Sequence, residues 1–364
     1  MNLKNYLLYF LLMVVHISCS QNNISNTKEN LLQNPDIDRF DNQVKFMTFN
    51  IWQEGTSVSN GLIKIRDVIT ETNPDIVCFT EVRNYKNKDW TNKIIKELRD
   101  KGYSFYRGYV GGDISLISKF PITSGSLINN GEGSIAKFDV NINKNTIVVA
   151  CAHLDYTKYA CYLPRGYNGG TPNWNMINDD NENPAPVTDV DQILAYNLKS
   201  ERDEQIADFL KDIENETQPV ILMGDFNEPS HLDWTENTSD LFDHNGVVIN
   251  WQSTHVLFKN GFTDAFRNFF PDEKSNPGIT WPSLAHGEKS TSWTPKSDER
   301  DRIDYIFYKG KSIETLYATL IGPKDSYAYG ELTDSFTSNE NFIADKLDWP
   351  SDHKAVMVIL KFPF

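Results

Sequence analysis

Strand-like apolar runs alternate with helix-like apolar spacing along most of this sequence. The strand-like runs occupy residues 44–51, 75–80, 114–118, 146–151, 219–223, 304–308 and 355–360, and their length and character are typical of buried strands. Between several of them, apolar residues recur at helical intervals, namely Leu62, Ile65 and Ile69; Ile94, Ile95 and Leu98; Ile193, Leu194 and Leu198; and Ile206, Phe209 and Leu210. This mixture predicts an α/β (α+β) fold in which helices cover two sheets, rather than an all-β or all-helical protein.

The size and composition of the chain predict one large domain. Its 364 residues are 39% hydrophobic, which is enough to bury a sizeable core. Two segments, residues 156–188 and 270–300, are rich in Gly, Pro, Asn and Trp. We expect both to be long surface loops near the functional site.

The first residues resemble an export signal rather than part of the fold. Lys4 precedes an apolar stretch at residues 6–17, which is shorter than the ~20 residues of a stable membrane span. Ser18-Cys19 then resembles a bacterial lipobox, although His16 stands where such boxes usually have Leu. The resemblance implies that residues 1–19 are a lipoprotein signal ending at an acylated Cys19. Plain secretion and a cytoplasmic start are the alternatives.

The segment after this signal has a different composition. Residues 20–42 are rich in Asn and Gln and lack apolar periodicity, which predicts a flexible tether. The folded domain is therefore expected at residues 43–364. Acylation of Cys19 would attach that domain to the lipid bilayer of a bacterial cell envelope, with the inner and outer membranes both possible.

The cysteines do not form a disulfide framework. Without Cys19, the chain contains Cys78, Cys151 and Cys161, and an odd number does not describe a scaffold of bridges. Cys78 and Cys151 lie in apolar runs and are expected to be small buried side chains. A bridge between Cys151 and Cys161 is conceivable, but no feature of the sequence supports it.

The acidic composition argues against broad capture of nucleic acid. The formal net charge is −15, whereas binding to a phosphate backbone depends on Lys and Arg. An acidic enzyme can still bind a phosphate group through a metal ion. Nucleic acid is therefore a possible but not a favoured partner, and we expect a monomer.

Polar side chains stand directly after several of the apolar runs. Asn50, Glu81, His153 and Asp225 each end a strand-like segment, and Asn227 follows shortly after Asp225. Burying such groups without partners costs several kcal/mol. Their position at strand ends therefore predicts one polar cleft at one rim of the sheets.

The same residues belong to an ordered series of short motifs. In chain order they are Thr48-Phe49-Asn50, Thr80-Glu81-Val82, His153-Leu154, Gly224-Asp225-Phe226-Asn227, Arg302-Ile303-Asp304-Tyr305 and Ser351-Asp352-His353. This series resembles the endonuclease/exonuclease/phosphatase superfamily, which includes deoxyribonuclease I, neutral sphingomyelinases and inositol polyphosphate phosphatases. The resemblance spans residues 44–364. It implies a four-layer αββα sandwich of the deoxyribonuclease I type.

The resemblance also implies a metal site. Glu81 would be the principal ligand of Mg²⁺ or Mn²⁺, with Asn50 and Asp352 contributing directly or through water. Hard oxygen ligands of this kind suit both ions. The sequence has no Gly-rich phosphate loop, no zinc-type cysteine pair and no nucleophile elbow, so attack by metal-positioned water is favoured over a covalent intermediate.

The remaining motif residues acquire catalytic roles by the same resemblance. Asp225 would orient or deprotonate the attacking water, and Asn227 would donate a hydrogen bond to the phosphoryl oxygens. His353 would contact the scissile phosphate, with Asp304 fixing its tautomer. His153 would assist the leaving group.

Three further residues are possible supporting groups. Asp113 lies where many relatives have a polar residue near the second histidine, although a plain turn residue is the alternative. Arg202 and Gln205 lie one helical turn apart and resemble a recurring Arg-x-x-Gln pair, interpreted as scaffold support.

The predicted function is metal-dependent hydrolysis of a phosphoric ester, most simply a phosphodiester. Three alternatives remain open, since fold analogy cannot choose among them. They are a DNA or RNA endonuclease, a sphingomyelinase-like phospholipase C that acts on a lipid headgroup, and a sugar or inositol phosphatase. A non-catalytic accessory lipoprotein for polysaccharide utilisation is the alternative of another class. A lost ligand or histidine would be its signature, and none is lost here.

Overall fold

The computed structural model describes residues 42–131, 133–170, 174–177, 183–285, 292–333, 342–343 and 348–364. Residues 43 onward belong to a compact unit, Gln43–Phe364. The predicted signal and tether, apart from Asn42, lie outside the described residues. Among the helices of the described part, none is long and apolar enough to cross a membrane.

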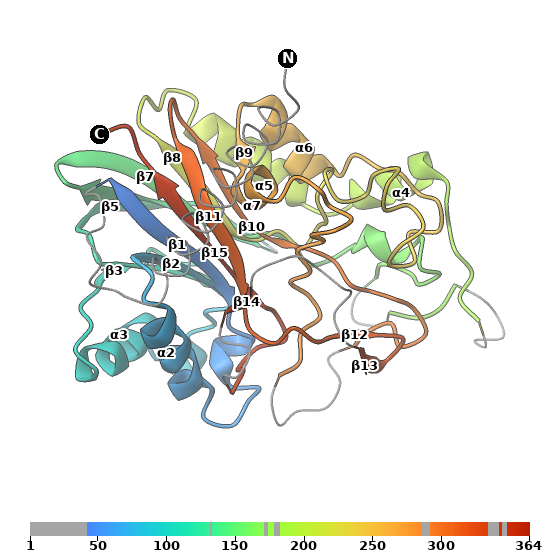
Figure 1. The fold of residues 1–364 in the computed structure, drawn as a ribbon, viewed down its shortest axis with the longest axis horizontal. Helices are drawn as coiled ribbons and strands as arrows, with labels where there is room; N and C mark the ends of the chain where they lie inside the picture. The colour runs from blue at the N-terminus through green and yellow to red at the C-terminus, as the bar shows by residue number, and fades with distance from the viewer. Residues whose placement is uncertain are drawn as a thin grey trace, which may run out of the picture. The chain divides into compact units, whose positions relative to one another are not determined.

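The first sheet has seven strands in the order β14-β11-β15-β1-β2-β4-β3. Their bounds are β1 Gln43–Asn50, β2 Ile76–Thr80, β3 Tyr106–Gly108, β4 Ile114–Ser118, β11 Glu314–Ile321, β14 Phe342–Ile343 and β15 Ala355–Lys361. β1 and β2 are parallel neighbours, whereas β15 pairs antiparallel with β1. The last strand of the chain therefore lies beside the first (Figure 1).

The second sheet has six strands in the order β5-β6-β7-β8-β10-β9. Their bounds are β5 Ile122–Asn130, β6 Ser134–Ile142, β7 Asn145–His153, β8 Val220–Asp225, β9 Thr263–Asp264 and β10 Asp304–Lys309. β7 and β8 are parallel, and β10 runs antiparallel to β8. A separate two-stranded sheet joins β12 (Ser326–Ala328) to β13 (Glu331–Thr333).

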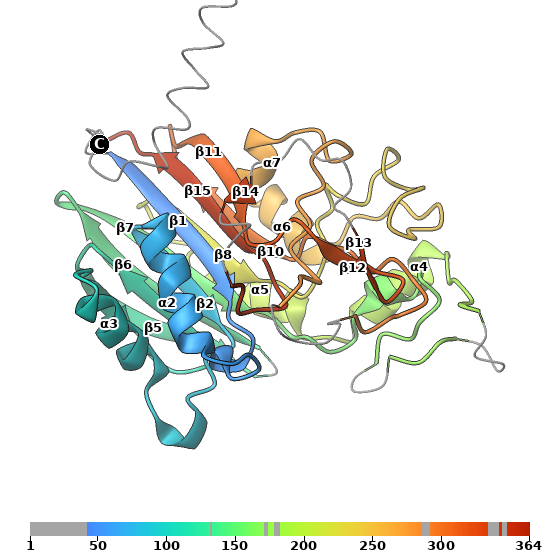
Figure 2. The same ribbon diagram turned by 60° about the horizontal axis from the view of Figure 1, so that its bottom comes forward.

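The two large sheets pack face to face, and helices cover their outer sides. The central apolar cluster draws on both sheets, with Phe46 and Val358 from the first and Val149 and Met223 from the second. α2 (Gly61–Thr72) and α3 (Trp90–Asp100) lie on the outer side of the first sheet (Figure 1 and Figure 2). α5 (Arg202–Asp212) and α6 (Gln252–Lys259) pack on the second. The predicted four-layer αββα sandwich is thus confirmed.

Apolar spacing accounts for the helices. In α2, Ile65, Val68 and Ile69 are buried, and in α3 Ile94 and Leu98 are buried, as the helical period requires. α3 also begins with a side-chain cap, since Asp89 accepts a hydrogen bond from the backbone N–H of Asn92 at 2.9 Å. The remaining helices are α4 Val190–Asn197 and α7 Ala265–Phe269, with short 3₁₀ turns at Gln53–Gly55, Tyr85–Asn87 and Ala160–Tyr162.

All seven predicted strands are present, and further ones were not predicted. The unpredicted long strands are β5, β6 and β11. β5 is an edge strand with five consecutive exposed residues, so it lacks the apolar pattern that marks a buried strand. Cys78, Cys151 and Cys161 are buried free thiols, so the conceivable Cys151–Cys161 bridge is not formed.

Candidate active site

Strand register brings the predicted site residues to one end of the sandwich. In the first sheet Asn50 lies beside Thr80, so Glu81 follows directly. In the second sheet Asp225 has His153 as its neighbour on one side and Asp304 on the other. Parallel strands end at the same edge of a sheet, and therefore these side chains meet without long loops.

Two backbone features sharpen this convergence. Gly224 has φ of 153°, and a Cβ on it would stand 1.7 Å from the carbonyl oxygen of Ala152. No other residue fits there, and so β7 and β8 can approach closely just before His153 and Asp225. Glu81 and Asn227 adopt left-handed backbone conformations, with φ of 64° and 47°, which turn the chain sharply at the strand ends.

One oxygen of Asp225 is the centre of the cluster. Its Oδ2 accepts a hydrogen bond from Nδ2 of Asn50 at 2.9 Å. The Nε2 atoms of His153 and His353 lie 3.8 and 3.7 Å from the same oxygen. Asp225 is 1% exposed, so these three groups supply the polar surroundings that a buried carboxylate needs.

Each imidazole is held from behind by a second carboxylate. Nδ1 of His353 lies 2.9 Å from Oδ2 of Asp304, and Nδ1 of His153 lies 2.7 Å from Oδ2 of Asp113. This arrangement leaves both Nε2 atoms facing Asp225. It is also the orientation that the sequence predicts for Asp304 and for Asp113.

The carboxylates keep both histidines charged. Burial lowers the pKa of His153, but the negative charges of Asp113, Asp225 and Glu81 outweigh burial and raise it to about 9. For His353 the same balance, dominated by Asp304 and Asp225, raises the pKa to about 10. Conversely, although burial opposes ionisation of Asp113, His153 and Arg83 lower its pKa to about 2. Near neutral pH the cluster contains two imidazolium groups.

Glu81 and Asp352 form a further acidic pair beside the histidines. Burial, together with repulsion from Glu81, raises the pKa of Asp352 to about 7, despite the nearby His353. Oδ1 of Asp352 is buried and has no hydrogen-bond partner among the described residues. Glu81 accepts hydrogen bonds from the Gln53 backbone N–H at 2.8 Å and from Asn50 at 3.3 Å. A cation beside Asp352 and Glu81 would balance both charges, so the donor set fits a divalent metal.

A second group of potential ligands consists of Asp225, Asp304 and His353, whose ligand atoms lie within 4.8 Å of one another. Here His353 already bonds Asp304 through Nδ1. His353 therefore already compensates one of the two carboxylates. The acidic pair of Glu81 and Asp352 is the better cation site.

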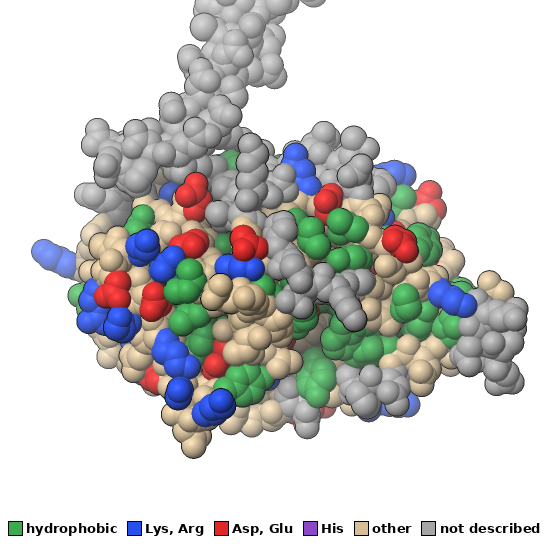
Figure 3. Space-filling view, turned by 90° about the horizontal axis from the view of Figure 1, so that it is seen from below, with side chains coloured by type: hydrophobic (Ala, Val, Ile, Leu, Met, Phe, Trp, Pro, Cys, Tyr) green, Lys and Arg blue, Asp and Glu red, His purple; other side chains and the backbone are tan. Residues whose placement is uncertain are grey.

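Several of these residues, including Glu81, His153, Asp225, Asp352 and His353, line a cavity of about 400 Å³. Aromatic side chains from the two long loops also line this cavity, namely Tyr156, Tyr159, Tyr162, Trp174, Trp281 and Trp293. Both loops that the sequence predicts near the site therefore contribute to it. On the face seen in Figure 3, hydrophobic side chains border a hollow.

Comparison with known proteins identifies the family. The sequence profile described as "Endonuclease/Exonuclease/phosphatase family" matches residues 47–353. The chain belongs to the endonuclease/exonuclease/phosphatase family. It is also 30% identical over 324 residues to the uncharacterized protein F14F9.5 of Caenorhabditis elegans, covering 88% of this chain and 92% of that protein.

Solved structures share the fold of this family member at low sequence identity. Truncated Caenorhabditis elegans TDP2 is 17% identical with a TM-score of 0.50, covering 88% of this chain and 98% of that one. D. rerio TDP2 complexed with a single-strand DNA product is 15% identical with a TM-score of 0.50, covering 88% and 99%. A family protein from Leptotrichia buccalis is 16% identical with a TM-score of 0.50, covering 88% and 100%.

The remaining predicted residues, Asn227, Arg202 and Gln205, lie around the Asp225 cluster and make different contacts. Asn227 lines the cavity, but its Nδ2 donates to the carbonyl of Leu154 at 3.0 Å, so one of its two amide hydrogens remains for a ligand. Arg202 donates to three backbone carbonyls of residues 155–158. Gln205 accepts from the Asp155 N–H at 3.0 Å. Arg202 and Gln205 therefore hold the loop that follows His153.

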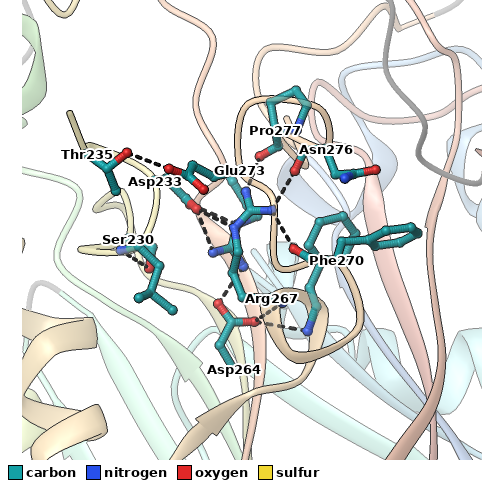
Figure 4. Close-up of polar contacts among 12 residues, drawn as sticks. Ser230, Asp233, Thr235, Asp264, Arg267, Phe270, Glu273, Asn276 and Pro277 are labelled. Carbon is teal, nitrogen blue, oxygen red and sulfur yellow. Dashed lines mark hydrogen bonds and ion pairs between the residues drawn. The ribbon is translucent and has the colours of Figure 1, made fainter. Parts of the chain in front are cut away.

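A buried ionic network centred on Arg302 holds the chain just before β10, two residues ahead of Asp304. Arg302 bonds Asp233 through Nε at 2.9 Å and Asp264 through Nη1 at 2.7 Å. Arg267 also bonds Asp233, at 2.8 Å, and reaches the carbonyls of Phe270, Asn276 and Pro277 (Figure 4). Since bidentate arginine pairs are geometrically specific, this network limits movement of the segment that carries Asp304.

Some contacting residues were not predicted. Arg83 bonds Asp113 at 2.7 Å and lies 3.7 Å from Glu81, but a single Arg in a turn gives no sequence signal. The sequence alone leaves open whether Lys101, Arg107, Lys158 and Arg165 form a local basic rim. Arg165 is instead buried against Asp301, and Arg107 pairs with Asp89.

The pair of Asp113 and His153 generates a test of the electrostatics. In Asp113→Asn, the largest opposing charge is removed while burial remains, so the pKa of His153 should fall from about 9 to near or below 6.5, the ordinary value. Imidazole nitrogen NMR against pH, recorded on metal-free protein, measures this pKa. The exposed Asp240→Asn is the matched control. An unchanged pKa in Asp113→Asn would contradict the pairing.

Proposed function

We propose that this protein hydrolyses a phosphodiester with a divalent metal ion, Mg²⁺ or Mn²⁺, and water. The supporting observation is the convergence on Asp225. Two imidazolium groups and one amide surround a single carboxylate oxygen, beside the acidic pair of Glu81 and Asp352. Such a site offers positive charge for phosphoryl oxygens and a base for water at the same point.

Each residue then has a defined role. Asp225 orients the attacking water and accepts its proton as the new oxygen–phosphorus bond forms. His353, oriented by Asp304, contacts the phosphoryl oxygens, while Asn227 donates its remaining amide hydrogen to them. His153, oriented by Asp113, gives its Nε2 proton to the departing ester oxygen as the phosphorus–oxygen bond breaks.

The metal would be held by Glu81, with Asn50 and Asp352 contributing directly or through water. It supplies Lewis-acid stabilisation of the charge that develops on the phosphoryl group. Asn50 Nδ2 already bonds Asp225 and Glu81, so its Oδ1 is the atom available to a cation. That oxygen accepts the Trp52 N–H at 3.0 Å, and a second lone pair remains.

The metal assignment predicts the behaviour of Glu81→Gln. Removal of this charge weakens cation binding and the charge stabilisation that depends on it, an effect worth several kcal/mol in the transition state. We expect a folded variant in which calorimetry detects weakened Mn²⁺ binding and hydrolysis no longer rises with Mg²⁺. Glu71→Gln, at an exposed position of α2, is the control. A wild-type Mg²⁺ titration in Glu81→Gln would refute the assignment.

Small phosphodiesters are the favoured substrates over duplex DNA. The net charge is −15, and among the described residues that line the cavity Arg83 is the single Lys or Arg side chain. A nuclease that follows duplex backbone uses several cationic contacts and loses affinity steeply with salt. The DNA product in a D. rerio TDP2 structure of the same fold keeps single-stranded nucleic acid as the second candidate.

This preference predicts the outcome of a substrate comparison. Turnover of bis(p-nitrophenyl) phosphate should exceed nicking of supercoiled plasmid and should change little with NaCl beyond general screening. Both assays use the same enzyme, metal and buffer. Efficient nicking at physiological salt without turnover of small esters would move the nuclease function to first place.

An anchored location is proposed from the sequence alone. We propose that Cys19 is acylated and attaches the domain of residues 43–364 to a bacterial membrane through the tether of residues 20–42. Cys19→Ser should then move active protein from the membrane fraction to the soluble fraction, because the acyl chains provide the attachment. Fractionation with mass spectrometry of the amino-terminal peptide measures this. Unmodified Cys19 in soluble wild-type protein would support plain secretion.

A further inference from the structure

The connection from β1 to α2 contains a run of left-handed backbone conformations. Trp52, Gln53, Glu54 and Gly55 have consecutive φ angles of 42°, 57°, 62° and 71°, and the Gly55 N–H closes the turn by donating to the Ile51 carbonyl at 2.7 Å. We call residues 52–55 the left-handed turn. Non-glycine residues adopt this conformation singly rather than in runs, because it brings Cβ close to the following carbonyl oxygen. Other contacts must therefore stabilise three such residues in succession.

The backbone N–H groups of the left-handed turn point at two of the residues proposed as metal ligands. The Trp52 N–H donates to Oδ1 of Asn50 at 3.0 Å. The Gln53 N–H donates to Oε2 of Glu81 at 2.8 Å, and the Glu54 N–H donates to the Glu81 carbonyl at 3.1 Å. Successive N–H groups of a turn form a concave site for anionic oxygen atoms. Here oxygens of the ligand residues themselves occupy that site.

The bond from Gln53 leaves the two carboxylate oxygens of Glu81 in different states. Oε2 accepts the Gln53 N–H, whereas the bond that Oε1 accepts from Asn50 is longer, at 3.3 Å. Oε1 is therefore the oxygen more available to a cation. Gln53 is exposed, so water could satisfy its N–H if the turn only joined β1 to α2. The bond to Glu81 instead orients a ligand, and partners of this kind typically contribute about 10–100-fold to metal affinity.

The segment of residues 85–90 holds the left-handed turn from outside. The Tyr85 hydroxyl donates to Oε1 of Gln53 at 2.6 Å, and the Tyr85 N–H donates to Oε1 of Glu54 at 3.1 Å. Nε1 of Trp90 donates to the Glu54 carbonyl at 3.2 Å. Glu54 is 5% exposed, whereas Tyr85 is 40% exposed. The Tyr85 hydroxyl can therefore be removed without disturbing the buried contacts of Glu54.

We propose that Tyr85 is a positioning residue for the metal site. Its hydroxyl holds the Gln53 side chain, which keeps the left-handed turn closed and the Gln53 N–H directed at Glu81. This inference rests on the proposed function, because it requires that Glu81 binds the divalent ion. Tyr85 acts through Gln53 and Glu81 and does not need to contact the substrate.

The first test removes the hydroxyl and keeps the ring. In Tyr85→Phe, the Kd for Mn²⁺, measured by calorimetry on metal-free protein, should rise roughly threefold. This is less than the loss of a direct partner of a ligand would cause, because Tyr85 acts through Gln53. Tyr329→Phe is the matched control, since it removes an exposed hydroxyl bond to Asp243 of 2.9 Å, and it should keep the wild-type Kd. An unchanged Kd in Tyr85→Phe would overturn the positioning role.

A double-mutant cycle tests whether Tyr85 acts through Gln53. Gln53→Ala removes the acceptor of the same hydrogen bond. The double variant should therefore bind Mn²⁺ as weakly as Gln53→Ala alone, because the hydroxyl has nothing left to hold. Losses of affinity that multiply would show that Tyr85 acts by another route, and the inference would fail.

Hydrogen exchange separates a metal-positioning role from a purely structural one. In metal-free Tyr85→Phe, the backbone amides of residues 52–54 should exchange faster than in the wild-type protein, because the turn opens more often. Faster exchange together with a raised Kd supports the positioning role. Faster exchange with an unchanged Kd would show that the contact stabilises the turn alone, which contradicts the inference.

The binding measurements use no substrate, so they also separate this inference from the proposed function. Raised Kd values in the variants of a protein that hydrolyses no phosphoric ester would refute the proposed function and support the positioning role. Metal-dependent hydrolysis with equal Kd values in wild-type protein and Tyr85→Phe would refute the positioning role alone.

Discussion

The structure depends on burying an unusual number of ionisable groups at one point. Asp225, Asp304, Asp352, His153 and His353 are each at most 5% exposed, and an isolated charge in such surroundings would be neutralised or expelled. Here each imidazolium bridges two carboxylates, with Nδ1 toward Asp113 or Asp304 and Nε2 toward Asp225. Replacing one member with an uncharged group leaves its partners without compensation. The same arrangement that permits burial also presents protonated nitrogen atoms to an anionic ligand.

This compensation works only if the two sheets end together. Asn50 comes from the first sheet and Asp225 from the second, yet their side chains are 2.9 Å apart. Two further contacts fix the strand ends within each sheet, one in the first sheet and one in the second. The Ser351 hydroxyl bonds the Asn50 carbonyl at 2.6 Å, and Gly224 allows close contact between β7 and β8. Packing of the apolar faces therefore positions the site to within the tolerance of a hydrogen bond.

Strand and site residues were predictable from the sequence to different degrees. Apolar runs that end in Asn50, Glu81, His153 or Asp225 predict both the strand and the site residue. Burial along the run and polarity at its end are local properties of the sequence. Pairings between distant residues are not local, so Arg83 with Asp113 and Arg165 with Asp301 had no signature. β11 was missed although its last five residues are buried. Its sequence mixes Thr, Ala and Tyr with Leu and Ile, which gives a weaker apolar run than β1 or β15.

The site divides its work between the sheets and the loops. Groups that would act on phosphate stand at strand ends or next to them, where sheet packing limits their movement. The rings that would distinguish one ester from another come from the loop segments around residues 156–174 and 281–293. Loops tolerate substitution far better than packed strands, so the identity of the alcohol can change while the reacting centre stays the same. In this chain the loops are nevertheless firmly held, by Glu299 behind Tyr162 and by Arg202 behind residues 155–158. Loops supported in this way lose little conformational entropy when a ligand binds.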